Sequence, residues 1–167
     1  MKQEKDQSKV KDLTEEDKIE SCRMYENEYP NVNDLVMCKI TEIFDDGAYV
    51  ELLEYNNIKG MILKSEITRK RKQNVKQITR EGKDEVLKVI RIDTAQGYID
   101  LSKKDVKTDE IDAFQEYYGK SKQVHNIMKS IAMKIKVKKL EELYKLFGWE
   151  LYREYKHAYE GFKLILE

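Results

Sequence analysis

The chain has little of what metal centres, disulfide frameworks and membrane proteins require. Its two cysteines, Cys22 and Cys38, do not form a CxxC pair, and no histidine stands beside either. This spacing argues against a zinc site or a disulfide framework and indicates a reducing compartment. No apolar run approaches membrane-spanning length. The N-terminus lacks the apolar core of a signal peptide and is too acidic for a transit peptide, so we expect a cytoplasmic protein without a membrane partner.

Catalytic signatures are also missing. The two histidines, His125 and His157, fall in segments with helical periodicity, where packing or surface exposure is the ordinary role. No nucleophile–base pair, glycine-rich phosphate loop or metal-ligand spacing is present. The sequence therefore predicts a non-enzymatic protein with no metal and no cofactor of its own.

Net charge is also absent, since 32 basic residues balance 32 acidic ones. The distribution along the chain is uneven. Residues 1–62 carry 8 basic and 15 acidic side chains, whereas residues 63–83 carry 8 basic and 2 acidic ones. A concentrated positive segment in an acidic half indicates contact with a polyanion.

What the sequence does contain, from residue 35 onward, is strand-like segments separated by turn residues. "DDG" at Asp45–Gly47 and "NN" at Asn56–Asn57 are tight-turn signals, and Gly60 predicts a bulge or a sharp bend. The expected strands are Leu35–Ile43, Ala48–Tyr55, Ile58–Leu63, Asp84–Asp93 and Tyr98–Ser102. Five short strands with a long insertion after the third predict a Greek-key barrel of the oligonucleotide-binding (OB) type.

From Thr108 the apolar period becomes helical. Gly119 and Ser121 suggest a helix stop followed by a new N-cap. We therefore predict a β + α chain with three parts: a disordered or frayed extension over 1–21, an OB-fold RNA-binding barrel over 22–105 with a basic loop at 64–83, and an all-helical domain over 106–167. The chain stops inside an apolar stripe, from which we expect the natural protein to continue.

The basic segment has two interpretations. Six of its cations could neutralise phosphates, each adding a salt-dependent contribution to RNA affinity, with nearby tyrosines available for base stacking. The plain alternative is a solvated loop without a ligand. The candidate RNA contacts are Arg69, Lys70, Arg71, Lys72, Lys76 and Arg80.

Thr68 stands directly before this run of cations. Its hydroxyl, or that of Ser65, could simply cap a short helical turn. Alternatively it is a phosphoacceptor, where a phosphate of roughly −1.5 to −2 charge would be paired by arginines.

Two blocks of sequence carry a resemblance. "GAYVELLEYNNIKGMILKSEIT" (Gly47–Thr68) and "GYIDLSKKDV" (Gly97–Val106) resemble the alpha subunit of eukaryotic translation initiation factor 2, and looser similarity runs from Cys22 to the end. The resemblance implies an S1-like OB fold followed by helices. It also implies delivery of initiator methionyl-tRNA to the small ribosomal subunit, near messenger RNA, within a heterotrimer of alpha, beta and gamma subunits. GTP would bind the gamma subunit and not this chain.

The resemblance further implies regulation. Stress-activated kinases phosphorylate a serine in this loop of the family, and the product inhibits the guanine-nucleotide exchange factor. That serine falls on Thr68 and its neighbouring serine on Ser65. Threonine keeps the hydroxyl but adds a methyl group that stiffens χ1. The family's kinase-docking element falls on Gly97, Tyr98, Ile99 and Asp100.

Two other hypotheses share part of this pattern. A general RNA-binding module of another RNA-processing pathway would share the barrel and the basic loop. A decoy that traps the kinase would resemble the barrel but would lack the acceptor hydroxyl and the helices.

Overall fold

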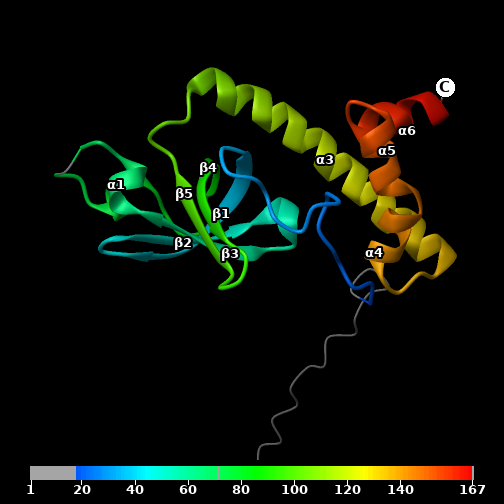
Figure 1. Cartoon of the computed structure of the whole chain (residues 1–167), viewed down its shortest axis with the longest axis horizontal. Helices are drawn as coiled ribbons and strands as arrows, with labels where there is room; N and C mark the ends of the chain where they lie inside the picture. The colour runs from blue at the N-terminus through cyan, green and yellow to red at the C-terminus, as the bar shows by residue number, and fades with distance from the viewer. Residues whose placement is uncertain (1–17, 71, 167) are drawn as a thin grey trace, which may run out of the picture.

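The computed structural model describes residues 18–70 and 72–166, in which a β-barrel and a helical part lie at opposite ends (Figure 1). The barrel closes in the order β1-β2-β3-β5-β4, with β3 and β5 parallel and the other pairs antiparallel. This confirms the predicted five-stranded OB fold. The strands are β1 Leu35–Phe44, β2 Gly47–Leu52, β3 Ile58–Leu63, β4 Asp84–Asp93 and β5 Tyr98–Ser102.

Turn residues act largely as expected. Asp45 and Asp46 join β1 to β2, and Asn56 and Asn57 adopt positive φ angles of 57° and 60°. The predicted strand Ala48–Tyr55 was too long, because β2 ends at Leu52 and Leu53–Tyr55 form a 3-10 turn before the asparagines. The bulge considered for Gly60 is absent, because its pairing with Val50 is regular. A Cβ on Gly60 would lie 2.8 Å from Leu101 Cδ1, so glycine is needed there for close packing inside the barrel.

Alternating apolar side chains of all five strands fill the barrel. Val50, Leu52, Val89 and Leu101 have no exposed surface at all. Ile67 and Val75, which come from the long connection between β3 and β4, also join this core. The connection is thus anchored to the barrel at two apolar points.

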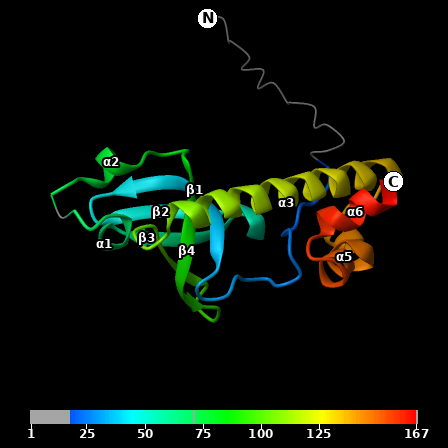
Figure 2. The same cartoon turned by 90° about the horizontal axis from the view of Figure 1, so that it is seen from above.

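The helical part begins with α3, Thr108–Ile135, a single helix that projects from the barrel (Figure 2). The predicted break at Gly119–Ser121 is absent. Ser121 is completely buried and its hydroxyl bonds to side chains from other segments, so it does not cap a new helix. The helices after α3 are α4 Leu140–Leu143, a π-helical turn Tyr144–Gly148, α5 Trp149–Glu154 and α6 Ala158–Leu166.

A second apolar cluster joins these helices and includes Val124, Met128, Tyr144 and Trp149. Both histidines are buried beside it, which fits the packing role expected for them. His125 Nδ1 lies 2.7 Å from the Tyr144 hydroxyl. Burial lowers the pKa of each histidine to about 4, so both are neutral near pH 7.

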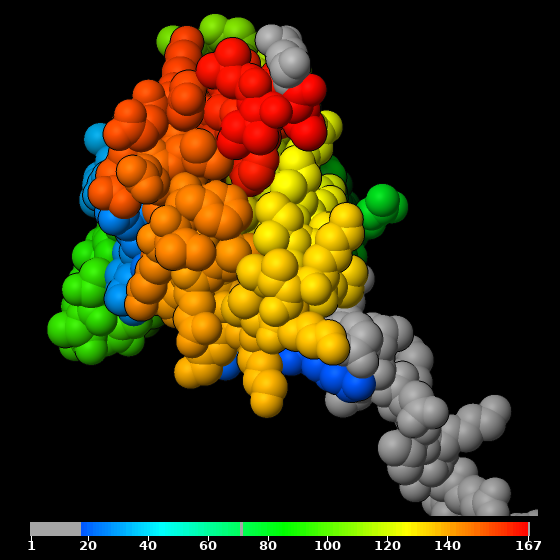
Figure 3. All heavy atoms as spheres, turned by 90° about the vertical axis from the view of Figure 1, so that its right-hand side faces the viewer, coloured from blue at the N-terminus to red at the C-terminus, as the bar shows by residue number. Residues whose placement is uncertain are grey.

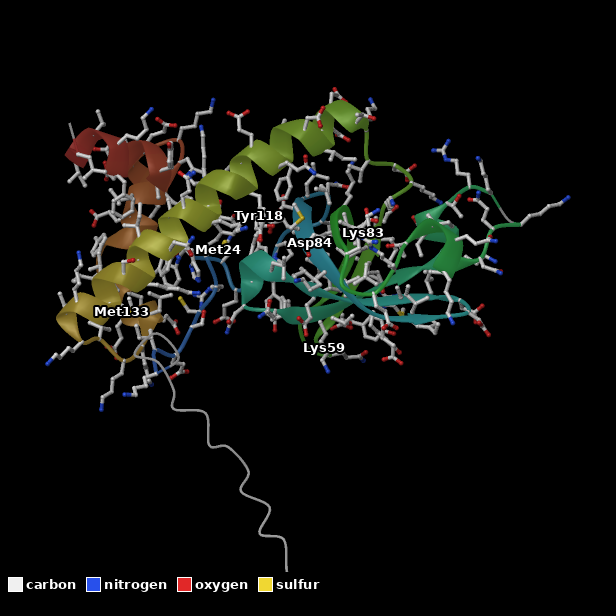
Figure 4. The ribbon with its side chains drawn as sticks, turned by 180° about the vertical axis from the view of Figure 1, so that it is seen from behind. Met24, Lys59, Lys83, Asp84, Tyr118 and Met133 are labelled. Carbon is white, nitrogen blue, oxygen red and sulfur yellow. The ribbon has the colours of Figure 1, made fainter. Side chains whose placement is uncertain are left out.

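The segment before β1 connects the two ends. Glu20 forms a parallel bridge with Lys139, and Cys22 is buried in the helical cluster. The Trp149 indole donates to the Met24 carbonyl, and Met24 N–H donates to Glu54 O at 2.9 Å (Met24 in Figure 4). Residues 18–21 therefore pack against the helices, which differs from the frayed extension expected over 1–21. The remainder of that extension, 1–17, lies outside the described residues.

A hydrogen-bond chain crosses from the helices to the barrel. Tyr159 N–H donates to His157 Nδ1, so in the neutral imidazole Nε2 carries the proton and donates to Ser121 Oγ at 3.0 Å. The Ser121 hydroxyl then donates to the Tyr25 hydroxyl, 2.9 Å away, and Tyr25 donates to Glu54 Oε2. In this chain, His157, Ser121 and Tyr25 each donate to the next group on the way to Glu54 in the barrel.

Among the described residues, no helix is long and apolar enough to cross a membrane.

Candidate functional site

The basic loop, residues 64–83, is built on two short helical turns. The first is α1, Lys64–Ile67, and the second is α2, Val75–Ile78. Ile67 and Val75 are 5% and 3% exposed, so each turn holds one end of the intervening segment against the barrel. Asn74 N–H donates to Gln77 Oε1 at 3.0 Å, which closes the start of α2.

Hydrogen bonds and ion pairs also fasten the first turn to the segment that follows β5. The Glu66 carbonyl accepts from the backbone N–H groups of Lys103 and Lys104, at 2.9 and 3.0 Å. The Glu66 carboxylate also pairs with Lys104 Nζ, and Arg69 pairs with Asp105 at 2.9 Å. The loop is therefore connected to the residues that follow β5.

Thr68 is half-buried at the end of α1, and its N–H donates to the Lys64 carbonyl. Its hydroxyl oxygen accepts from Lys70 N–H at 3.1 Å. Neither Thr68 nor Ser65 is the N-cap of a helical turn here, since those positions are Leu63 and Asn74. Thr68, Ser65, Lys64 and Lys70 line a surface hollow of about 400 Å³. Thr68 therefore borders the surface, beside two lysines and Asp46.

The structure exposes most of the predicted phosphate contacts. Arg69 is exposed but already paired with Asp105. Lys70, Lys72, Lys76 and Arg80 are exposed and make no ion pair with any described residue. Arg71 lies outside the described residues. Four of the six predicted cations are therefore available to an anionic partner.

An aromatic face lies on the adjoining strands. Tyr49 of β2 and Tyr98 of β5 are 47% and 46% exposed. They line one hollow of about 210 Å³ with Met61 and Lys59, and Phe44 packs beside Tyr49 at a ring-centroid distance of 5.0 Å. Exposed rings and a basic loop on the same barrel are the two components that single-stranded nucleic-acid sites combine. Tyr55 is instead buried in the core and is not available for stacking.

Three of the four predicted docking residues, Gly97, Tyr98 and Ile99, line this hollow. Gly97, with φ 68°, and Tyr98 are exposed, whereas Ile99 is buried in the core. The Asp100 Oδ1 atom is buried and has no hydrogen-bond partner among the described residues. Because Asp100 pairs with Met61 on β3, the docking strand adjoins the strand that leads into α1 and Thr68.

Sequence reasoning missed Glu54, which is only 1% exposed. Its carboxylate accepts from Tyr25 and from Met37 N–H at 2.8 Å. Burial raises the pKa of Glu54 to about 7, although both hydrogen bonds favour the charged form. Its position between apolar residues in "LLEY" is the one signal that could have identified it. In the part of the chain that the structure describes, no group of three His, Cys, Asp or Glu side chains is arranged to hold a metal.

Comparison with known proteins places this geometry in a family. The family model of the S1 RNA binding domain matches residues 29–104. Eukaryotic translation initiation factor 2 subunit alpha of Arabidopsis thaliana is 48% identical over 145 residues, which is 87% of this chain and 42% of the relative. Subunit 1 of the same factor from Dictyostelium discoideum is 50% identical over 149 residues, covering 87% and 44%. The chain thus spans less than half the length of these relatives.

Solved structures point to the same family as the sequence relatives. The intact alpha subunit of aIF2 from Pyrococcus abyssi superposes with a TM-score of 0.75 at 28% identity, covering 82% of this chain and 52% of that one. The a/eIF2alpha chain in a complex with aDim2p and rRNA from Pyrococcus horikoshii gives a TM-score of 0.71 at 28% identity, covering 80% and 79%. These matches confirm the resemblance expected from the sequence: over most of its length, this chain is homologous to part of the alpha subunit of eukaryotic translation initiation factor 2.

Proposed function

We propose that this chain is part of a translation initiation factor subunit. In that role it helps to deliver initiator methionyl-tRNA to the small ribosomal subunit within a heterotrimer whose gamma subunit binds GTP. The observation that carries the proposal is the 48–50% identity to alpha subunits over 87% of the chain. The beta and gamma subunits, the exchange factor and messenger RNA are the partners that follow from it.

The barrel is the proposed RNA contact. Its support is the S1 match, the exposed rings of Tyr49 and Tyr98, and four exposed cations of the loop that make no ion pair with a described residue. Tyrosine rings would stack on bases, while Lys70, Lys72 and Arg80 would neutralise phosphates. A complex of one structural relative contains rRNA, which supports the same type of ligand.

We also propose that Thr68 is a phosphoacceptor for stress-activated kinases. Thr68 lines a surface hollow with Lys64 and Lys70, and a phosphate on its hydroxyl would remain within reach of the Lys70 N–H. The element Gly97–Asp100 would dock the kinase at a distance from the acceptor. A rigid strand would then select a loop that is anchored at Ile67 and Val75.

Phosphorylation of the full chain by a kinase that modifies eIF2 alpha subunits tests this proposal. Wild type, Thr68→Ser, Thr68→Ala and Ser65→Ala are compared by phosphopeptide mapping. We expect label on wild type, faster labelling of Thr68→Ser because its χ1 is freer, and loss in Thr68→Ala alone. Undiminished label in Thr68→Ala would refute the assignment.

The alternative function is an RNA-binding module of another RNA-processing pathway, which the rRNA-containing relative favours. Recovery of the full-length protein from cells distinguishes the two. Co-purification with gamma subunit and initiator tRNA supports the initiation role, whereas recovery with processing factors and neither of these supports the alternative.

A further inference from the structure

A second basic surface lies at the far end of α3, away from the barrel. The 24 residues from Tyr117 to Leu140 contain seven lysines and no acidic residue. Four of these lysines gather where α3 ends and the chain turns into α4. We call them the lysine tip: Lys134, Lys136, Lys138 and Lys139.

All four tip lysines are exposed, and none makes an ion pair with a described residue. By contrast, Lys120 and Lys145 pair with Glu160 and Glu141. The end face of the helical part displays the yellow and orange surface of this turn (Figure 3), and the labelled Met133 marks it in Figure 4. The tip is thus a group of exposed positive charges that no acidic side chain of the described residues neutralises through an ion pair.

The backbone that carries the tip is fixed. Lys136 adopts φ 59° as the C-cap of α3, and Val137 N–H donates to the Ala132 carbonyl at 3.0 Å. On the other side, Glu20 N–H donates to the Lys138 carbonyl, and Leu140 N–H donates to the Glu20 carbonyl. The four charges are held close together at little entropic cost to the backbone.

Helix stabilisation accounts for only part of this cluster. Lysines near the C-terminus of a helix interact favourably with its dipole, which suits Lys134 and Lys136. Lys138 and Lys139 lie beyond that end and directly before α4, where positive charge is unfavourable. Their concentration there is better explained by an external anion.

The basic loop lies at the other end of α3. Arg69 pairs with Asp105, three residues before α3 begins, so the loop is fastened near Thr108. The 28 residues of α3 span about 42 Å at about 1.5 Å per residue. Two positive surfaces therefore stand tens of ångströms apart on a chain with no net charge.

We propose that the lysine tip binds the phosphate backbone of the same RNA that contacts the barrel, so that a long RNA is held at both ends of α3. No aromatic residue occurs between Met133 and Leu140, so this contact does not involve base stacking and is independent of sequence. Lysine supplies point charges without the bidentate geometry of arginine, which suits such a contact. The proposal rests on the RNA contact of the barrel.

Length dependence separates the two surfaces. An RNA of about 8 nucleotides fits one OB fold, whereas one of about 40 nucleotides can reach both surfaces. The full chain is titrated with each fluorescently labelled RNA at several salt concentrations. The tip is tested with Lys138→Gln/Lys139→Gln and with the quadruple Lys→Gln variant, and Lys156→Gln/Lys163→Gln is the charge-matched control.

We expect the quadruple variant to bind the long RNA about tenfold more weakly, with its log–log salt slope reduced by up to about 3. Its affinity for the short RNA is unchanged, and the matched control resembles wild type with both RNAs. The pair Lys138→Gln/Lys139→Gln, which leaves α3 intact, gives a smaller loss with the long RNA only. Circular dichroism and Tm verify that each variant is folded.

Three outcomes would overturn the proposal. One is equal weakening by the tip pair and by the matched control, and another is long-RNA affinity unchanged in the quadruple variant. The third concerns vesicles of anionic phospholipid, which are an alternative ligand because Met133 and Ile135 are also exposed at the tip. It is that wild type binds these vesicles and the quadruple variant does not, while the RNA affinity of the variant is unchanged. If the wild-type chain binds neither RNA, the proposed RNA contact of the barrel is contradicted. Titration with the short RNA tests that contact separately from the tip.

Discussion

The hydroxyl of Tyr25 donates a hydrogen bond to the buried carboxylate of Glu54 and accepts one from Ser121 of α3. One tyrosine oxygen thereby joins the barrel to the long helix. Three other tyrosine rings, Tyr55, Tyr117 and Tyr152, lie within 6.2 Å of the Tyr25 ring, so the contact is both polar and aromatic. This arrangement makes Tyr25 the centre of the interface between the two parts.

Removing that hydroxyl should destabilise the chain. Tyr25→Phe leaves the Glu54 carboxylate with one donor fewer in a buried site, and we expect a loss of about 1–3 kcal/mol in the free energy of unfolding. Urea denaturation measures it. Tyr155→Phe, at a ring that is 38% exposed, is the control and should change little. Equal stability of Tyr25→Phe and wild type would show that the bond contributes nothing.

Stability should depend on pH through Glu54. The folded carboxyl keeps its proton up to a pKa of about 7, against an ordinary value of 4.5. Between these values the folded state binds more protons than the unfolded state, so Glu54 lowers the free energy of unfolding as pH rises from 4.5 to 7. His125 and His157 act oppositely between pH 4 and 6.5, because their folded pKa is the lower one.

Glu54→Gln isolates the carboxyl contribution, because both proteins retain the histidines. We expect the variant to gain stability relative to wild type by about 2 kcal/mol between about pH 5 and pH 8. Urea denaturation across that range measures the difference. A constant difference at every pH would mean that Glu54 ionises alike in both states.

Anchoring of the basic loop should depend on Ile67. Ile67→Ala removes a side chain that is 5% exposed in the barrel core, and we expect a loss of about 2–4 kcal/mol in the free energy of unfolding. Ser65→Ala, at an exposed position in the same helical turn, should be neutral. Limited proteolysis should also cleave the Ile67→Ala loop faster, and unchanged cleavage would indicate that other contacts hold the loop.

Two glycines should respond oppositely to alanine. Gly60→Ala would place a methyl group 2.8 Å from Leu101 Cδ1, and we expect a loss of about 1–3 kcal/mol in stability. Gly119 lies inside α3, and a methyl group added to it would meet no atom within 4 Å, so Gly119→Ala should stabilise by about 0.5–1 kcal/mol. Thermal melting compares them, and a shift of Tm in the same direction for both would contradict this account.

Local patterns were sufficient to predict the barrel. Period-two apolar residues mark the strands, the turn at Asp45–Asp46 separates β1 from β2, and Asn56–Asn57 directly precede β3. These signals depend only on near neighbours in the chain. The basic loop could be predicted equally well by counting charges along the chain. Lys70 and Lys72 are exposed, as expected of a charged loop.

Long-range contacts could not be predicted in the same way. The bond of Arg69 to Asp105 and the bond of Tyr25 to Ser121 join residues 36 and 96 positions apart. Gly119 and Ser121 resembled a helix boundary because local propensity favours one there. The tertiary bonds of Ser121 and the apolar face around Val124 override that propensity.

The unbroken course of α3 fixes an angle as well as a length. Ser121 bonds to Tyr25 where α3 contacts the barrel, and Lys134 comes 13 residues later on the same helix. The helical repeat therefore fixes the side of α3 on which Lys134 lies relative to that contact. Inserting one residue between them would turn the tip by about 100° about the helix axis, whereas inserting seven would nearly restore its direction and move it about 10 Å outward. Rotational phase along α3 is therefore a property that homologous chains would have to preserve if both ends act on one ligand.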